Sequence, residues 1–331
     1  MLYVTTRSNC ETYTAAKTLT VDTAPDGGLF VPFQMPKVNV AELRGMPQEA
    51  VISHVLGLFF RTVPSGDEVL ECLGGTPLRA SDIDRKVTVA QLWNNRRRTF
   101  EKIEYDLYCK LCREVPANGK ATQWAKTAIR IAVLCALVAS GGREVDIAVN
   151  AGDFLTPMAA YYCRQMGMPV GTILCVTNEN SNLWDLFTHG ELNCSVSVLP
   201  TELPLLDTPV PAQLERLVFS VDGLHTAKEF AACLENRKTY KCENGWELSE
   251  GFAVSVVSSR RVESVISKLY RTNQYVLDTY GALTFGGLQD HRASSGDICH
   301  TLLLSEYSPM EHRKTVSAAL NVPEFKLSEL L

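Results

Sequence analysis

Two cysteines three positions apart, Cys109 and Cys112, form the one CxxC pair of the chain. Such a pair can ligate zinc or cycle between a dithiol and a disulfide, and a structural zinc site adds a second pair or two histidines. The chain has no second pair, and its six histidines do not follow at that spacing. Because the apolar residues of 105–112 recur at helical spacing, we expect both cysteines on the core face of a helix and predict no metal site.

A turn that contains a glycine, residues 151–153, follows the apolar run 145–149 and precedes a helix that begins near Thr156. A glycine at a helix N-terminus lets backbone N–H groups approach an anion. Asp153 can instead cap the helix by accepting a hydrogen bond from one of its first N–H groups. From the residues alone, an anion site and a simple cap both remain open.

Helices and apolar strands alternate after residue 122, and this order sets where such turns lie. Helices are expected at 122–139, 156–166 and 182–188, and strands at 145–149, 171–177 and 196–199. The βαβαβ order predicts an α/β fold with a parallel sheet flanked by helices. Further helices are expected over 40–60, 100–112, 212–221, 226–236, 261–270 and 311–320, and further strands over 87–93, 253–257 and 302–304.

Composition excludes several classes of protein. The 331 residues are 46% hydrophobic and 21% charged, which is enough for a large core. The net charge of −5 and pI of about 5.8 argue against nucleic acid as a partner. The apolar run 129–139 is too short for a membrane span, so we expect a buried helix and no membrane partner. Eleven cysteines scattered through apparent core segments, with no signal peptide, predict a reduced cytoplasmic protein.

Several phrases, in chain order and nearly end to end, resemble threonine synthase. The family begins with Thr-Arg and a phrase close to Leu-Ala-Pro-Asp-Gly-Gly-Leu-Tyr-Val-Pro, and later carries Asn-Trp-Ala-Arg, Gly-Asn-Phe-Gly-Asn, Phe-Glu-Arg-Leu-Leu-Phe and Leu-Asp-Pro-His-Thr. The corresponding residues here are 6–7, 23–32, 123–126, 152–156, 214–219 and 275–280. The resemblance implies the fold of the tryptophan synthase β subunit, type II among pyridoxal phosphate enzymes.

The resemblance also implies a reaction, the conversion of O-phosphohomoserine and water to threonine and phosphate. Pyridoxal phosphate serves that family as an imine on a lysine within a phrase like Gly-Pro-Thr-Leu-Ala-Phe-Lys-Asp-Phe. When residues 95–103 are aligned on Phe100, the lysine position holds Glu101. Lys102 is one residue away, which on a helix turns a side chain by about 100°. Lys102 is therefore the imine lysine only if the alignment slips by one residue.

The phosphate loop of the family is degenerate in this chain. Its five positions hold Gly152, Asp153, Phe154, Leu155 and Thr156. Leu155 adds a side chain where close approach of a phosphate needs none. Asp153 adds a negative charge beside a dianion, and at ~4 Å each such charge pair costs about 1 to 4 kcal/mol.

The small domain that closes over the substrate in the family has no counterpart, because 104–121 is too short to form one. A look-alike of the family's Ser-Gly-Asp-Thr-Gly loop, residues 294–297, comes too late in the chain and reads as a surface turn. We therefore expect residues 1–121 to be an N-terminal threonine-synthase-like segment with a remnant of the lysine region. Residues 122–331 would form the α/β large domain.

Three functions follow from this pattern. The favoured one is a degenerate homologue without cofactor that binds a ligand or a protein, as a homodimer or a complex formed through the face that the missing domain would bare. The alternative is an active pyridoxal phosphate-dependent lyase acting on O-phosphohomoserine, with Lys102 as the imine lysine and Gly152–Thr156 holding the phosphate. The third is a sensor of a phosphoamino acid that keeps part of the substrate pocket without the cofactor.

Overall fold

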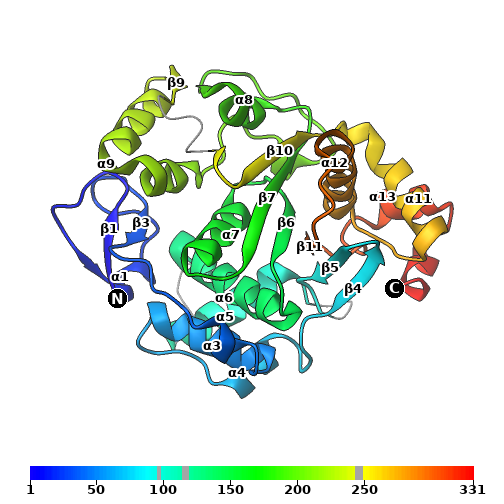
Figure 1. Ribbon diagram of the computed structural model, residues 1–331, viewed down its shortest axis with the longest axis horizontal. Helices are drawn as coiled ribbons and strands as arrows, with labels where there is room; N and C mark the ends of the chain where they lie inside the picture. The colour runs from blue at the N-terminus through cyan, green and yellow to red at the C-terminus, as the bar shows by residue number, and fades with distance from the viewer. Residues whose placement is uncertain (95–97, 114–118, 243–248) are drawn as a thin grey trace.

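A six-stranded sheet forms the centre of the computed structural model, which describes residues 1–94, 98–113, 119–242 and 249–331 (Figure 1). The strand order is β10-β7-β6-β11-β5-β4. The first five strands in that order run parallel, and β4 pairs antiparallel with β5 at one edge. The predicted α/β fold with a mainly parallel sheet is thereby confirmed. The strands are β4 (Ala80–Asp84), β5 (Val87–Gln91), β6 (Val145–Asn150), β7 (Val170–Thr177), β10 (Phe252–Val256) and β11 (Thr301–Ser305).

The central strands are apolar on both faces because helices cover both. All five residues of β11 are buried, and this strand pairs with β6 on one side and with β5 on the other. Helix α7 (Leu155–Gln165) packs on one face of β6 and β7, backed by α6 (Gln123–Gly141). Helix α12 (Thr279–Ser295) covers the other face, backed by α11 (Val262–Asn273), and α13 (Arg313–Leu320) packs on α11 (Figure 1).

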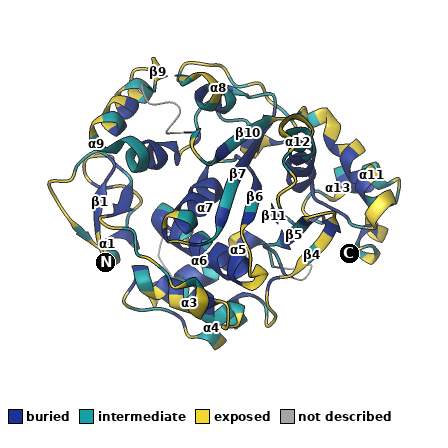
Figure 2. Cartoon of the chain, in the orientation of Figure 1, coloured by how far each residue is buried: buried dark blue, intermediate teal, exposed yellow. Residues whose placement is uncertain are grey.

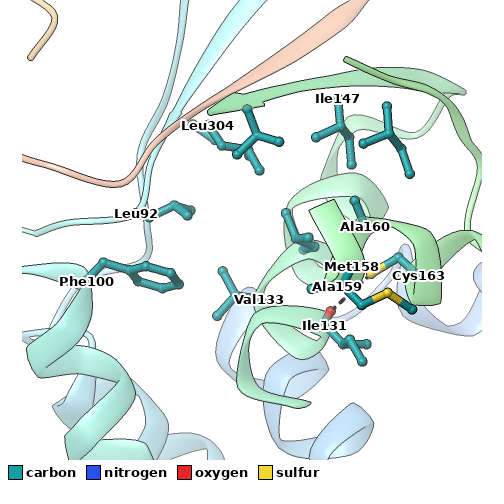
Figure 3. Close-up of a cluster of buried hydrophobic side chains, with 14 of the residues drawn as sticks. Leu92, Phe100, Ile131, Val133, Ile147, Met158, Ala159, Ala160, Cys163 and Leu304 are labelled. Carbon is teal, nitrogen blue, oxygen red and sulfur yellow. Dashed lines mark hydrogen bonds between the residues drawn. The ribbon is translucent and has the colours of Figure 1, made fainter. Parts of the chain in front are cut away.

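The core beneath the sheet draws side chains from segments far apart in the chain. Figure 3 shows Phe100 of α5 (Phe100–Cys112) and Val133 of α6 below Leu304 of β11 and Ile147 of β6. All four are at most 3% exposed. This packing fixes the start of α5 against α6 and the sheet, next to the cavity described below.

Helix α6 is buried, as expected, and its bounds lie within two residues of the helix predicted over 122–139. Its 19 residues are long and apolar enough to cross a membrane by length and composition alone. However, 78% of the apolar window is buried inside the protein, which is typical of a core helix (Figure 2). The expectation that this segment is too short to span a membrane rested on the run 129–139 alone and was wrong in length, because residues 123–128 and 140–141 belong to the same helix.

The N-terminal segment forms a small antiparallel sheet of β1 (Leu2–Thr5), β2 (Tyr13–Thr14) and β3 (Phe30–Pro32). The helix predicted over 40–60 is split at Pro47 into α2 (Val40–Leu43) and α3 (Gln48–Phe59), because proline is the N-cap of the second piece. Two short helices, α1 (Ala15–Thr18) and α4 (Gly66–Cys72), complete this part before β4 and β5 join the main sheet.

The strand predicted over 196–199 was wrong. Those residues are irregular, and Val196 and Leu199 are 40% and 55% exposed, so no neighbour buries them. The strand that follows α8 (Asn182–His189) is instead β8 (Glu191–Asn193), which pairs with β9 (Thr239–Lys241). The two helices predicted between 212 and 236 lie within α9 (Leu214–Glu235), which breaks at Gly223, where φ is 80°. Three 3₁₀ turns are η1 (Pro204–Leu206), η2 (Ser259–Arg261) and η3 (Glu324–Glu329).

Candidate functional site

A cavity of about 260 Å³ lies at the carboxyl end of β6, where ligands of α/β sheets collect. The N-termini of α5 and α7 border it, and α6 forms its floor. The residues that line it are Thr99, Phe100, Glu101, Glu104, Lys126, Arg130, Asn150–Asp153, Leu155–Pro157, Leu205, Glu306, Tyr307 and Glu311. The structure thus brings four of the five predicted phosphate-loop residues, Gly152, Asp153, Leu155 and Thr156, to one cavity.

Phe154, the fifth loop residue, turns away from this cavity. Its backbone is left-handed, with φ 69°, and its fully buried ring stacks on Phe252 at 6.0 Å between centroids. The turn directs Asp153 Oδ1 to the backbone N–H of Leu155, which donates to it at 3.1 Å. Asp153 precedes the N-cap, Phe154, and its carboxylate takes the first N–H of α7, a donor that a bound phosphate would need.

Buried ion pairs fill the floor of the cavity. Arg130 Nε donates to Glu104 Oε1 at 2.8 Å, and its Nη1 donates to Glu306 Oε1 at 2.9 Å. Arg130 also bonds to the hydroxyl of Thr156, which donates to Glu306. Both carboxylates are at least nine-tenths buried. The predicted loop residue Thr156 is therefore held by the protein's own charges.

In this network, burial and ion pairing shift the pKa values of the charged groups in opposite directions. Burial lowers the pKa of the Arg130 guanidinium, but Glu104 and Glu306 outweigh it and hold that pKa above the ordinary value. Burial raises the pKa of Glu104, and Arg130 offsets only part of this effect. The guanidinium is thus committed to two carboxylates and is not available as an anion-binding group.

The two lysines of interest lie in different surroundings. Lys102 Nζ bonds to Asp106 Oδ1 at 2.6 Å along α5, and its side chain is 54% exposed. Lys102 does not line the cavity. Lys126 of α6 is half-buried and lines the cavity, as no other described lysine does. Sequence reasoning missed this position, although Gln123–Lys126 was noted as the start of a helix that resembles the family.

The charge of the cavity lining is negative. Five carboxylates line it (Glu101, Glu104, Asp153, Glu306 and Glu311) against two cations (Lys126 and Arg130), which gives a formal charge of −3. Burial raises the pKa of Glu311 above its ordinary value. Even so, a capped helix N-terminus among these acids does not fit a cofactor that carries a phosphate dianion.

A second buried acid that the sequence did not single out lies behind the cavity wall. Asp278 is 0% exposed, and its carboxylate accepts from the N–H groups of Tyr280 and Gly281 at the start of α12 and from Ser305. Burial raises its pKa to about 7, although these hydrogen bonds act in the opposite direction. His312 Nδ1 lies 4.0 Å from Asp278 Oδ1. Asp278 is thus the N-cap of α12 and a group that titrates near neutrality.

The two cysteines of the CxxC pair, Cys109 and Cys112, are half-buried on α5. No group of candidate metal ligands among the described residues includes either of them. The prediction that they lie on a helix is confirmed. Neither side chain is fully buried, so the expected core position is not observed.

Comparison with known proteins links this architecture to a family. Residues 2–73 match the family model for the threonine synthase N terminus. Human threonine synthase-like 1 is 28% identical over 150 residues, which are 44% of this chain and 20% of that protein. Threonine synthase of Saccharomyces cerevisiae is 26% identical over 202 residues, 54% of this chain and 38% of that protein. The matched part thus spans between about a fifth and two fifths of these relatives.

Solved structures share the fold over the whole chain. The pyridoxal phosphate-bound threonine synthase from Brucella melitensis matches with a TM-score of 0.84 at 17% identity, over 100% of this chain and 94% of that chain. The yeast enzyme matches with a TM-score of 0.84 at 16% identity, over the same shares. At such identities the likeness concerns the fold.

Proposed function

We propose that the chain is a degenerate member of the threonine synthase family that binds a ligand or a partner protein without pyridoxal phosphate catalysis. The observation that carries this proposal is the set of carboxylates around the N-terminus of α7. In an active member of the family this is the place of the phosphate loop. Here the carboxylate of Asp153 accepts the first N–H of α7, and Glu104 and Glu306 form ion pairs with Arg130.

In this proposal, repulsion between the carboxylates and the phosphate of pyridoxal phosphate disfavours binding of the cofactor. A phosphate dianion about 4 Å from one carboxylate loses about 1 to 4 kcal/mol per charge pair, depending on exposure. A loss of 1.4 kcal/mol already weakens binding tenfold. The same argument disfavours a sensor of phosphoamino acids, since its ligand would bring a phosphate to the same acids.

The second candidate, a pyridoxal phosphate enzyme, is favoured by one observation, the position of Lys126. The lysine named by the sequence, Lys102, points to Asp106 and solvent. An enzyme built on this fold would therefore have to use Lys126 as its reactive amine.

One experiment separates the two candidates. Purified protein is mixed with pyridoxal phosphate, its visible spectrum is recorded, and its mass is measured after borohydride reduction. We expect the spectrum of free coenzyme and an unchanged mass. A shifted band and a pyridoxyl adduct that the Lys126→Ala variant loses, and the Lys102→Ala control keeps, would establish the second candidate instead.

The surface beside the cavity supports association with a partner. Leu205 lines the cavity and is 46% exposed, and Leu199 at the start of the same loop is 55% exposed. Between α5 and α6 the chain has only residues 113–122, so no further domain covers the cavity from this point of the chain. We propose that this leucine-bearing loop is the contact for a second copy or for another protein.

A further inference from the structure

Three potential metal ligands converge at the amino ends of β6 and β11. The cavity lies at the opposite, carboxyl ends of the strands. Asp146 is the second residue of β6, and Asp297 and Cys299 precede β11. Their ligand atoms all lie within 4.8 Å of one another. Ligands bonded to one tetrahedral zinc ion at about 2.0–2.3 Å are about 3.3–3.8 Å apart. Small side-chain rotations would therefore bring the three onto one ion.

A small cavity borders Asp146 and Asp297 and leaves room for an ion beside them. Its volume is about 10 Å³, and Asp146, Asp297, His291 and Thr301 are among the residues that line it. This is about the room that one water or ion needs. His291 of α12 offers an imidazole, so the lining combines carboxylates, a thiol close by and an imidazole, the donor set of zinc.

Within the part of the chain that the structure describes, neither Asp146 nor Asp297 forms an ion pair. The neighbouring guanidinium of Arg292 instead donates to the carbonyl of Cys299 at 2.7 Å and to Thr301 Oγ1 at 3.0 Å.

Backbone groups hold the carboxylates in place. The N–H of Thr172 donates to Asp146 at 2.7 Å, and that of Cys299 donates to Asp297 at 2.8 Å. Gly171 leaves the space that Asp146 needs, because a Cβ at this position would lie 2.5 Å from Asp146 Oδ1.

We propose that Asp146, Asp297 and Cys299, with His291 as the fourth ligand, bind one divalent transition metal ion such as zinc. Cys299 is exposed, so the ion enters from solvent. The thiol loses its proton to solvent on binding, and the thiolate and imidazole select zinc over magnesium or calcium. Sequence reasoning predicted no metal because these ligands have no motif spacing and meet only when β6, α12 and β11 assemble.

Cobalt(II) titration of the full chain, freed of metal with a chelator and kept reduced, tests the proposal. We expect one equivalent to bind with a thiolate-to-cobalt charge-transfer band, and zinc to displace it. Cys299→Ser should lose the band, and Asp297→Asn should weaken binding at least tenfold. Cys10→Ser, which removes another exposed cysteine, should change neither.

Two results would overturn the site. One is the absence of a stoichiometric charge-transfer band in the wild type, and the other is a band that survives in Cys299→Ser. Circular dichroism of each variant checks that the fold is kept, and loss of the band from a folded Cys299→Ser protein supports the site. The outcome does not depend on whether the cavity at the carboxyl end of β6 binds the coenzyme.

Discussion

At the scale of residues, Arg130 decides what the candidate site can do. It joins Glu104 of α5, Thr156 of α7 and Glu306 after β11, three segments that are far apart in the chain. Such a network has no sequence signature, since each member looks like an ordinary charged or polar residue in its own segment. The loop residues Gly152–Thr156 could be located from the sequence, but the carboxylates around them could not.

The Arg130→Met variant should be strongly destabilised. Removing the guanidinium leaves Glu104 and Glu306 buried without their cation, which typically costs about 3–5 kcal/mol. Urea unfolding measures this loss. The matched control is Lys102→Met, which removes an exposed pair with Asp106 along α5 and should cost about 0.3–0.5 kcal/mol. Equal losses in the two variants would contradict the role given to Arg130.

Asp278 should make stability depend on pH. Its folded pKa of about 7 lies above the ordinary aspartate value of 3.8, so the folded protein retains the proton to higher pH than the unfolded chain does. The resulting stabilisation is complete below pH ~4 and is lost as the pH rises through ~7, by roughly 4 kcal/mol. Asp278→Asn keeps an acceptor for the α12 cap and removes the titration.

Urea unfolding of wild type and Asp278→Asn at pH 5 and pH 8 measures this contribution. The free energy of unfolding of wild type should fall more over this interval than that of the variant. His312 and Glu311 lie nearby and remain in both proteins, so the difference between the two reports on Asp278. Parallel pH profiles would show that Asp278 does not titrate in this range.

At the scale of elements, local sequence patterns predicted helices and strands, but they did not predict packing or strand pairing between distant segments. The alternation of apolar strands with helices located β6, α7, β7 and α8. Residues 196–199 have an equally apolar pattern and form no strand, because nothing packs on them. The pairing of β5 with β11 joins residues more than 200 positions apart, and no local pattern encodes it.

Helix α7 should depend on its unusual start. Asp153→Ala removes the acceptor of the Leu155 N–H and should destabilise the protein by about 0.5–2 kcal/mol, the usual cost of a lost cap. Asp153→Asn keeps an acceptor without the charge and should cost much less. Thermal unfolding compares the two variants, and an Asn variant as unstable as the Ala variant would show that charge, rather than capping, is what α7 needs.

At the scale of the whole molecule, the cavity and the proposed metal site lie at opposite ends of the parallel strands. The loop that carries Leu199 and Leu205 lies beside the cavity. If that loop is the proposed contact, light scattering should find a dimer or a larger complex. Leu199→Ser/Leu205→Ser should convert a dimer to monomer. Phe325→Ser, which removes another exposed apolar side chain, should leave the mass unchanged. A wild type that is monomeric and binds no partner would contradict the proposed contact.

The central position of β11 has a consequence for synthesis on the ribosome. Strands β5 and β6 cannot be joined until Thr301–Ser305 arrives between them. Nascent chains must therefore keep two unpaired strand edges until residues 301–305 have left the ribosome. A premature stop codon anywhere upstream of residue 301 should yield a product that needs chaperones or aggregates, however complete its helices are.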